Sequence, residues 1–167
     1  MKKLVLVLFA TGLSALAFSQ NGGNRSTQQT ATITANEILD LTMTSNNALN
    51  FVFNNTSDYD NGITLAEATT FAVKSNKLWQ VKVKSSTANF SGGDGNMPAS
   101  VLSLGKHTSG TTTYTALSNS DNVLATGNRG ASAVSGNTFT VDYKANPGYA
   151  YTPASYTVDV VYTISAQ

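Results

Sequence analysis

The chain has 167 residues and contains no cysteine, one histidine and three prolines. Without cysteine no disulfide can form, so a hydrophobic core must stabilise the fold alone. The lack of cysteine, with His107 as the single histidine, also excludes the usual ligand sets of zinc sites. We therefore expect no bound metal and no cofactor.

Charge is scarce as well. Asp, Glu, Lys and Arg make up 11% of the residues, and the formal net charge is +1. Such a composition predicts no basic patch that would bind nucleic acid or anionic lipid. The apolar content of 41% is unlike that of a disordered chain. The composition suits an extracellular β-protein whose outer faces carry hydroxyl and amide groups.

The N-terminus has the parts of a secretory signal peptide. Lys2 and Lys3 precede an apolar run over residues 4–17, which is too short to span a membrane comfortably. We predict a signal peptide over residues 1–19, with cleavage after Ser19 or, alternatively, after Ala17. A retained N-terminal anchor helix is the other interpretation. The predicted location is secreted, at the cell surface or periplasmic, in a bacterium.

Residues 20–29 are polar and predict a flexible leader, and residues 30–167 predict one domain. Helical periodicity is nearly absent, whereas alternating apolar and polar residues recur between turn sequences. This pattern predicts an all-β fold, an antiparallel two-sheet sandwich of Ig-like or jelly-roll type. The predicted strands cover residues 30–35, 38–44, 49–53, 70–75, 78–85, 100–104, 113–117, 122–125, 137–144 and 156–164.

The only tryptophan, Trp79, shares one face of its predicted strand with Val81 and Val83. This alternation predicts that Trp79 is a core anchor and not a ligand contact. Two other predicted strands show apolar rows of the same kind, at residues 139, 141 and 143 and at residues 156, 158, 160, 162 and 164.

The stretch Thr30–Ala35 alternates threonine with Ala31, Ile33 and Ala35. It can pair within its own domain as an edge strand, which we favour. Alternatively, Thr30, Ile33 and Ala35 belong to a donor strand that is added to the sheet edge of a neighbouring molecule.

Candidate catalytic residues are few. His107 lies in a polar turn, no Gly-x-Ser-x-Gly motif accompanies it, and we expect an exposed loop side chain. Asp142 and Asp159 fall on the outward faces of their strands, where carboxylates are solvated. These observations predict a protein that is not an enzyme.

Asp58–Gly62 departs from a calcium loop, because its glycine comes at the fifth position and Thr69, not glutamate, at the twelfth. It predicts a turn, with an irregular calcium site as the alternative. Tyr149 and Tyr151 lie in a predicted loop, where they can contact a carbohydrate ligand by stacking or cover an end of the sandwich.

The stretch Leu78–Val83 resembles the first motif of WxL-domain surface proteins, and Ser155–Ile164 resembles their closing strand. The second stretch is also similar to the last strand of pilin-like and spore-coat-U-like bacterial sandwiches. The resemblance implies a β-sandwich at the bacterial surface and, for WxL domains, attachment to peptidoglycan. Because the sequence ends at Gln167 just after the last strand, we expect any surface attachment to be non-covalent or through assembly.

We therefore expect a secreted or surface-displayed structural or adhesive protein, fimbrial-like, whose partners are further copies of itself or a cell-surface polymer. The alternative is a carbohydrate-binding module that uses exposed loop tyrosines. We expect neither a nucleic-acid partner nor a membrane span after signal cleavage.

Overall fold

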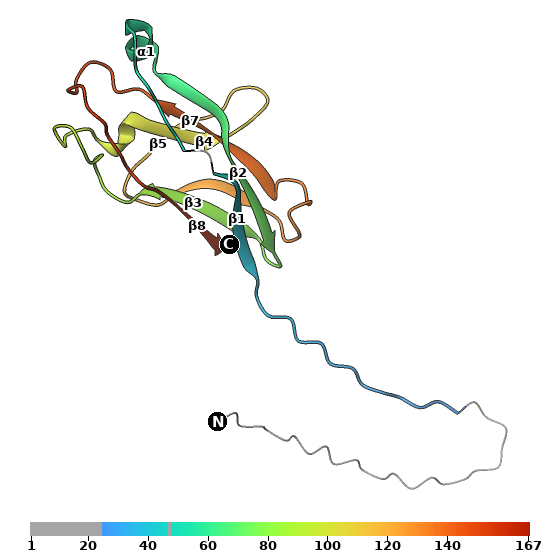
Figure 1. Ribbon diagram of the computed structural model, residues 1–167. Helices are drawn as coiled ribbons and strands as arrows, with labels where there is room; N and C mark the ends of the chain where they lie inside the picture. Colours follow the sequence, from blue (N-terminus) through green and yellow to red (C-terminus); the bar gives the residue numbers. More distant parts are fainter. Residues whose placement is uncertain (1–24, 47) are drawn as a thin grey trace, which may run out of the picture. The chain divides into compact units, whose positions relative to one another are not determined.

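The computed structural model describes residues 25–46 and 48–167, so the predicted signal peptide lies outside the described residues. The chain divides into two units, Met1–Thr34 and Ala35–Gln167. Residues 25–34 have no regular secondary structure, and their side chains are exposed. The strands that the structure describes all belong to the second unit (Figure 1).

The strands form two antiparallel sheets, which confirms the predicted all-β sandwich. One sheet has five strands in the order β1 (Leu39–Asn46), β2 (Ile63–Ser75), β7 (Thr138–Ala145), β4 (Leu102–Lys106) and β5 (Thr115–Ala116). The other has three, in the order β6 (Asn122–Gly127), β3 (Trp79–Ser85) and β8 (Val160–Ala166). A 3₁₀ turn, η1 (Ala99–Val101), precedes β4, and a short helix, α1 (Thr56–Asn61), precedes β2.

The core lies between the sheets, where the inward-facing apolar side chains of β3 pack against those of β7. Trp79 is completely buried, and its ring stacks on Phe139 of the opposite sheet at a centroid distance of 6.1 Å. The indole Nε1 donates hydrogen bonds to the carbonyl oxygen of Asn128 at 3.0 Å and to Oδ1 of Asn137 at 3.1 Å. Trp79 is therefore a core anchor with its one polar group satisfied.

A second contact between the sheets joins two phenol groups. The hydroxyl of Tyr143 on β7 lies 2.6 Å from that of Tyr162 on β8, and it donates to Oγ1 of Thr69 at 2.9 Å. Burial raises the pKa of both tyrosines above the usual value, so the phenols stay protonated and neutral. The buried hydroxyls thus join the sheets without a buried charge.

Two predicted strands are absent. Residues 30–35 form no strand, because they have no partner among the described residues, and Ile33 is 92% exposed. The second compact unit begins at Ala35. Residues 49–53 keep the predicted alternation, with Leu49, Phe51 and Phe53 packed against the core, yet they pair with no strand.

The turn predicted at Asp58–Gly62 is instead part of helix α1. Asn55 caps this helix, and its side chain accepts a hydrogen bond from the backbone of Asp58, whose carboxylate accepts one back from the Asn55 backbone. The helix ends at Asn61, and its C-cap, Gly62, has a φ of 73°, a conformation that favours glycine. Asp58 therefore belongs to the N-terminal cap of the helix and Gly62 is its C-cap.

We expect Trp79→Ala to lower the free energy of unfolding by about 3–5 kcal/mol, because it removes a fully buried aromatic side chain. Urea denaturation measures the change. Val161→Ala on the exposed face of β8 is the matched control, with an expected change within about 0.5 kcal/mol. A loss below about 1 kcal/mol for Trp79→Ala would contradict the role of this residue as the anchor of the core.

Candidate functional site

The sequence places Asp142 on an outward, solvated face, and this prediction is wrong. Asp142 is only 3% exposed, although its neighbours Val141 and Tyr143 point into the core on the other side of β7. It is covered because a bulge interrupts the pairing of β2 with β7 and because the loop after β4 folds over it. Asp159, in contrast, is exposed as predicted.

Three groups donate hydrogen bonds to the Asp142 carboxylate. They are the backbone N–H of Glu67 at 2.7 Å, the hydroxyl of Thr112 at 2.6 Å and Nδ1 of His107 at 2.9 Å. Glu67 sits in the bulge with a φ of 49°, a left-handed conformation that is costly for a residue other than glycine. The bond from its N–H to a buried carboxylate offsets part of this cost.

The loop at residues 107–114 is held tightly against β4. A Cβ atom on Gly105 would lie 2.2 Å from the carbonyl oxygen of Thr113, so only glycine allows this approach. Gly105 is also the strand partner of Asp142. The close packing and the Thr112 hydrogen bond together fix the loop over the carboxylate.

The same contacts shift the pKa values of the cluster. Burial alone would raise the pKa of Asp142, but the hydrogen bonds from Glu67, Thr112 and His107 outweigh it and lower the pKa. The hydrogen bond to Asp142 raises the pKa of His107, and the negative charges of Asp142 and Glu67 add to this effect. Nε2 of His107 lies 3.7 Å from Oε1 of Glu67. The cluster therefore favours the imidazolium form.

His107 is thus not the free, exposed loop side chain that the sequence predicts. A histidine base in a Ser-His-Asp triad needs one ring nitrogen on the aspartate and the other on the nucleophile. Here the second nitrogen faces the carboxylate of Glu67, which supplies no proton and stabilises the charged ring. The geometry therefore supports a structural clamp between β2, β7 and the loop.

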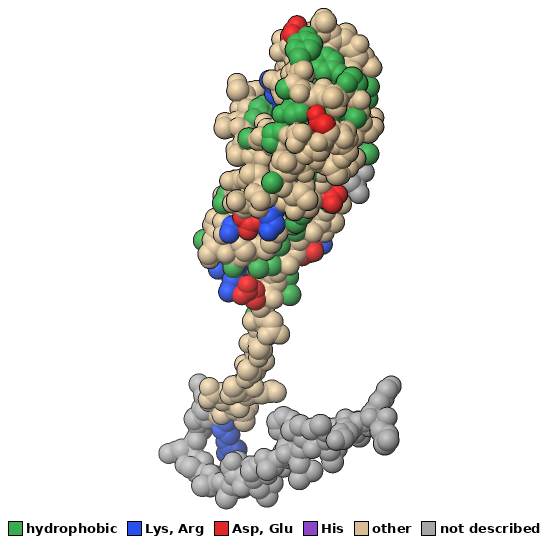
Figure 2. Space-filling view, turned by 90° about the vertical axis from the view of Figure 1, so that its left-hand side faces the viewer, with side chains coloured by type: hydrophobic (Ala, Val, Ile, Leu, Met, Phe, Trp, Pro, Cys, Tyr) green, Lys and Arg blue, Asp and Glu red, His purple; other side chains and the backbone are tan. Residues whose placement is uncertain are grey.

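The tyrosines predicted as ligand contacts lie in different environments. Tyr149 is 65% exposed, its ring stacks on Tyr59 of α1 at 5.2 Å, and its hydroxyl donates to Oδ1 of Asp60 at 3.0 Å. Figure 2 shows hydrophobic and acidic side chains together at the end of the sandwich unit that carries α1. Tyr151 is half-buried, with its ring edge-on to Tyr156. Tyr149 alone presents a broad exposed aromatic face.

The predicted donor-strand residues Thr30, Ile33 and Ala35 are all exposed. Contacts to the sandwich begin at Asn36, whose carbonyl oxygen accepts a hydrogen bond from Nδ2 of Asn76 at 2.7 Å, and Glu37 forms an ion pair with Lys77. Thr30–Ala35 therefore has a strand-forming sequence but no strand partner in the part of the chain that the structure describes.

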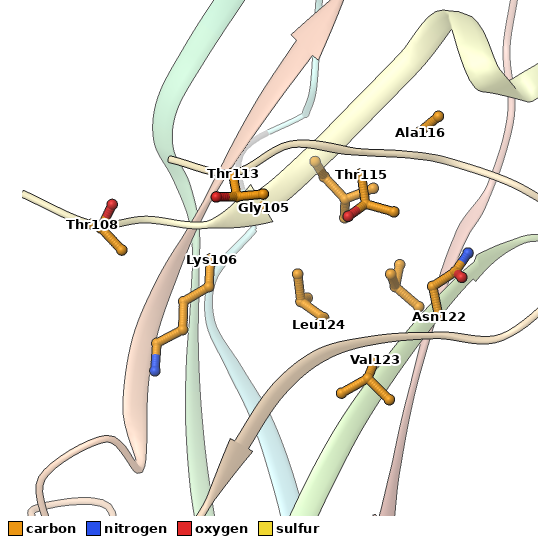
Figure 3. Close-up of a pocket in the computed structure, with 11 residues that line it drawn as sticks. Gly105, Lys106, Thr108, Thr113, Thr115, Ala116, Asn122, Val123 and Leu124 are labelled. Carbon is orange, nitrogen blue, oxygen red and sulfur yellow. The ribbon is translucent and has the colours of Figure 1, made fainter. Parts of the chain in front are cut away.

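A cleft of about 230 Å³ opens at the seam where β4 and β5 face β6 (Figure 3). Val83, Leu104 and Leu124 contribute apolar surface to it, and threonines of the loop and of β5 line its rim. Leu124 projects into the space between the strands, whereas Val123 lies on the other side of the β6 ribbon. Nothing in the sequence indicated this cleft, because its walls come from separate strands.

No protein-family model matches the chain, and no curated protein is significantly similar to it. The resemblance to WxL-domain and pilin-like proteins therefore stays a prediction. Within the described ranges, 25–46 and 48–167, no group of three or more acidic or histidine side chains is placed to hold a metal ion. No helix in that part of the chain is long and apolar enough to cross a membrane.

We expect the stability of the protein to fall as the pH rises from about 6 to about 9. The folded-state pKa of His107 lies above its unfolded value of about 6.5. The imidazolium contribution is therefore complete below that value and disappears as the pH rises through the folded-state pKa. Urea midpoints across this range measure the effect.

His107→Gln is the matched control, because glutamine can donate to Asp142 but does not titrate in this range. Its urea midpoint should change less between about pH 6 and 9 than that of the unaltered protein. Equal slopes for the two proteins would show that His107 does not couple stability to pH.

Proposed function

We propose that this protein is a non-enzymatic, secreted or surface-displayed β-sandwich that acts as a structural or adhesive subunit of an extracellular assembly. The observation that carries the proposal is the segment Thr30–Ala35, which has the alternation of a strand, is exposed, and has no strand partner among residues 25–46 and 48–167. A strand-forming segment outside a folded sheet is suited to pairing with the sheet edge of another molecule.

The chemistry of the segment supports this role. Residues 26–36 carry no charged side chain, so pairing in a sheet would bury no ion. Ile33 is the single large apolar side chain of Thr30–Ala35, and its burial would contribute about 1.5–3 kcal/mol. Backbone hydrogen bonds along the strand would add to that contribution and fix the direction of the pairing.

We expect the chain that starts at Gln20, the predicted mature N-terminus, to form oligomers or filaments. A chain that starts at Asn36 should stay monomeric at the same concentration, because it keeps the Asn36 and Glu37 contacts but lacks the strand-forming segment. Size-exclusion chromatography with light scattering and electron microscopy provide the measurement.

A pair of single substitutions tests whether assembly depends on the side chains of the segment or only on its presence. Ile33→Ser should shift the longer chain toward monomers, whereas Thr32→Ser, which changes the opposite face of the strand, should leave assembly intact. Monomers for both chain lengths at every concentration would overturn assembly through this segment.

Carbohydrate binding is the second candidate function, and the exposure of Tyr149 favours it. The stack on Tyr59 and the hydrogen bond to Asp60 hold the Tyr149 ring in one orientation before any ligand arrives. Aromatic faces presented in this way contact the apolar C–H face of sugars. This role is compatible with an adhesive surface protein.

If the protein binds glycans through this surface, Tyr149→Ala should abolish binding on a glycan array. Val52→Ala, which removes another exposed apolar side chain, should leave binding unchanged. Urea midpoints of both variants verify that the fold persists. Binding by Tyr149→Ala at the level of the unaltered protein would exclude Tyr149 as the ligand contact.

A further inference from the structure

We infer that the seam cleft between β4–β5 and β6 receives Thr30–Ala35 of a second copy of this chain, with Ile33 inserted between the two sheets. This inference rests on the proposed function and names the acceptor site for it. The strand would be added to the open edge of β6 and would extend the three-stranded sheet.

The cleft follows from the unequal width of the two sheets. Five strands span four spacings, about 19 Å, whereas three strands span two, about 10 Å. On one side β1 lies next to β8, and Leu39 and Leu41 pack there against the core. On the other side β4 and β5 extend past β6, and the cleft occupies the position of a missing fourth strand.

The edge of β6 is open for pairing. Among the described strands β6 pairs only with β3, so the backbone groups on its other edge have no strand partner. β5, which faces it across the cleft, has only two residues, Thr115 and Ala116. An added strand can therefore form backbone hydrogen bonds with β6 without displacing another strand.

The cleft also fits the side chain that the segment offers. An enclosed cavity of about 150 Å³ holds a benzene molecule. The open cleft, at about 230 Å³, therefore has room for an isoleucine side chain. Leu124 and Leu104, which line the cleft, would contact Ile33. Lys106 is the one charged residue that lines the cleft, and its ammonium group lies over the ring of Phe139 at 5.6 Å.

One wall of the cleft is fixed before the strand arrives. Thr108 and Thr113, which line the cleft, belong to the loop that the Asp142 cluster and Gly105 hold in place. A wall that is already ordered loses little conformational entropy when a partner binds. The polar clamp thus prepares a binding surface as well as stabilising the fold.

The length of the connection to β1 indicates whether the segment in the cleft comes from the same copy of the chain or from a second one. Ile33 precedes Leu39 by six residues, so it reaches about 20 Å at most from the start of β1. β1 and β5 are the opposite edges of a sheet about 19 Å wide, and the connection would also have to pass around the sandwich. The segment of a second copy meets no such limit.

Disulfide cross-linking tests the inference directly, because the chain has no cysteine of its own. Thr32 and Thr34 would face outward when Ile33 faces the cleft, and Val123 faces outward on β6. Full-length chains with Thr32→Cys or Thr34→Cys are mixed with chains carrying Val123→Cys under mild oxidation. Chains carrying Val161→Cys, on the outward face of the β8 edge, are the matched control.

We expect mixed disulfide dimers with Val123→Cys to form at least several-fold faster than with Val161→Cys, and Ile33→Ser in the donor chain to remove the difference. Faster cross-linking to Val161→Cys, or equal rates in chains that still assemble, would overturn the cleft as acceptor while the proposed function stands. If chains with Val123→Cys and chains with Val161→Cys both cross-link only at the background rate, and light scattering shows monomers, the acceptor cleft and the proposed function are both overturned.

Discussion

Packing of Trp79 against Phe139 joins the two sheets, and the same side chain holds the connection that follows β6. Its indole N–H donates to the backbone of Asn128 and to the side chain of Asn137, which is itself fully buried. Gly127 lies against the indole ring so closely that a Cβ atom would come within 2.2 Å of it. In a protein without disulfides, one aromatic side chain thus fixes the sheet contact and the connection between β6 and β7.

Much of this core could be predicted from the sequence, because alternation is a local pattern. The rows of Trp79, Val81 and Val83 and of Phe139, Val141 and Tyr143 are buried where a period of two places them. The role of Asn137 could not be predicted in this way. An asparagine next to glycine is typical of a turn, and its burial depends on an indole 58 residues away in the sequence.

The Asp142 cluster shows where the local pattern fails. Val141, Asp142 and Tyr143 are consecutive and all buried, which strict alternation forbids for a strand with one wet face. The exception arises from a bulge in β2 whose backbone N–H binds the carboxylate across 75 residues of sequence, and from a loop that Gly105 admits. The single histidine was visible in the sequence, but its aspartate partner depends on tertiary contacts.

Alternation indicates that a segment can form a strand, whereas a partner decides whether it does. Residues 30–35 and 49–53 both alternate, and neither is paired within the described chain. The second segment packs its apolar side chains against the core, although its backbone pairs with no strand. The first has neither a strand partner nor a packed side chain, and its side chains are exposed. The number of strands in each sheet, which no local pattern encodes, leaves one seam of the sandwich open. A strand-forming segment that is unpaired within the described chain and an uncovered edge of β6 are the two features on which the proposed self-assembly rests.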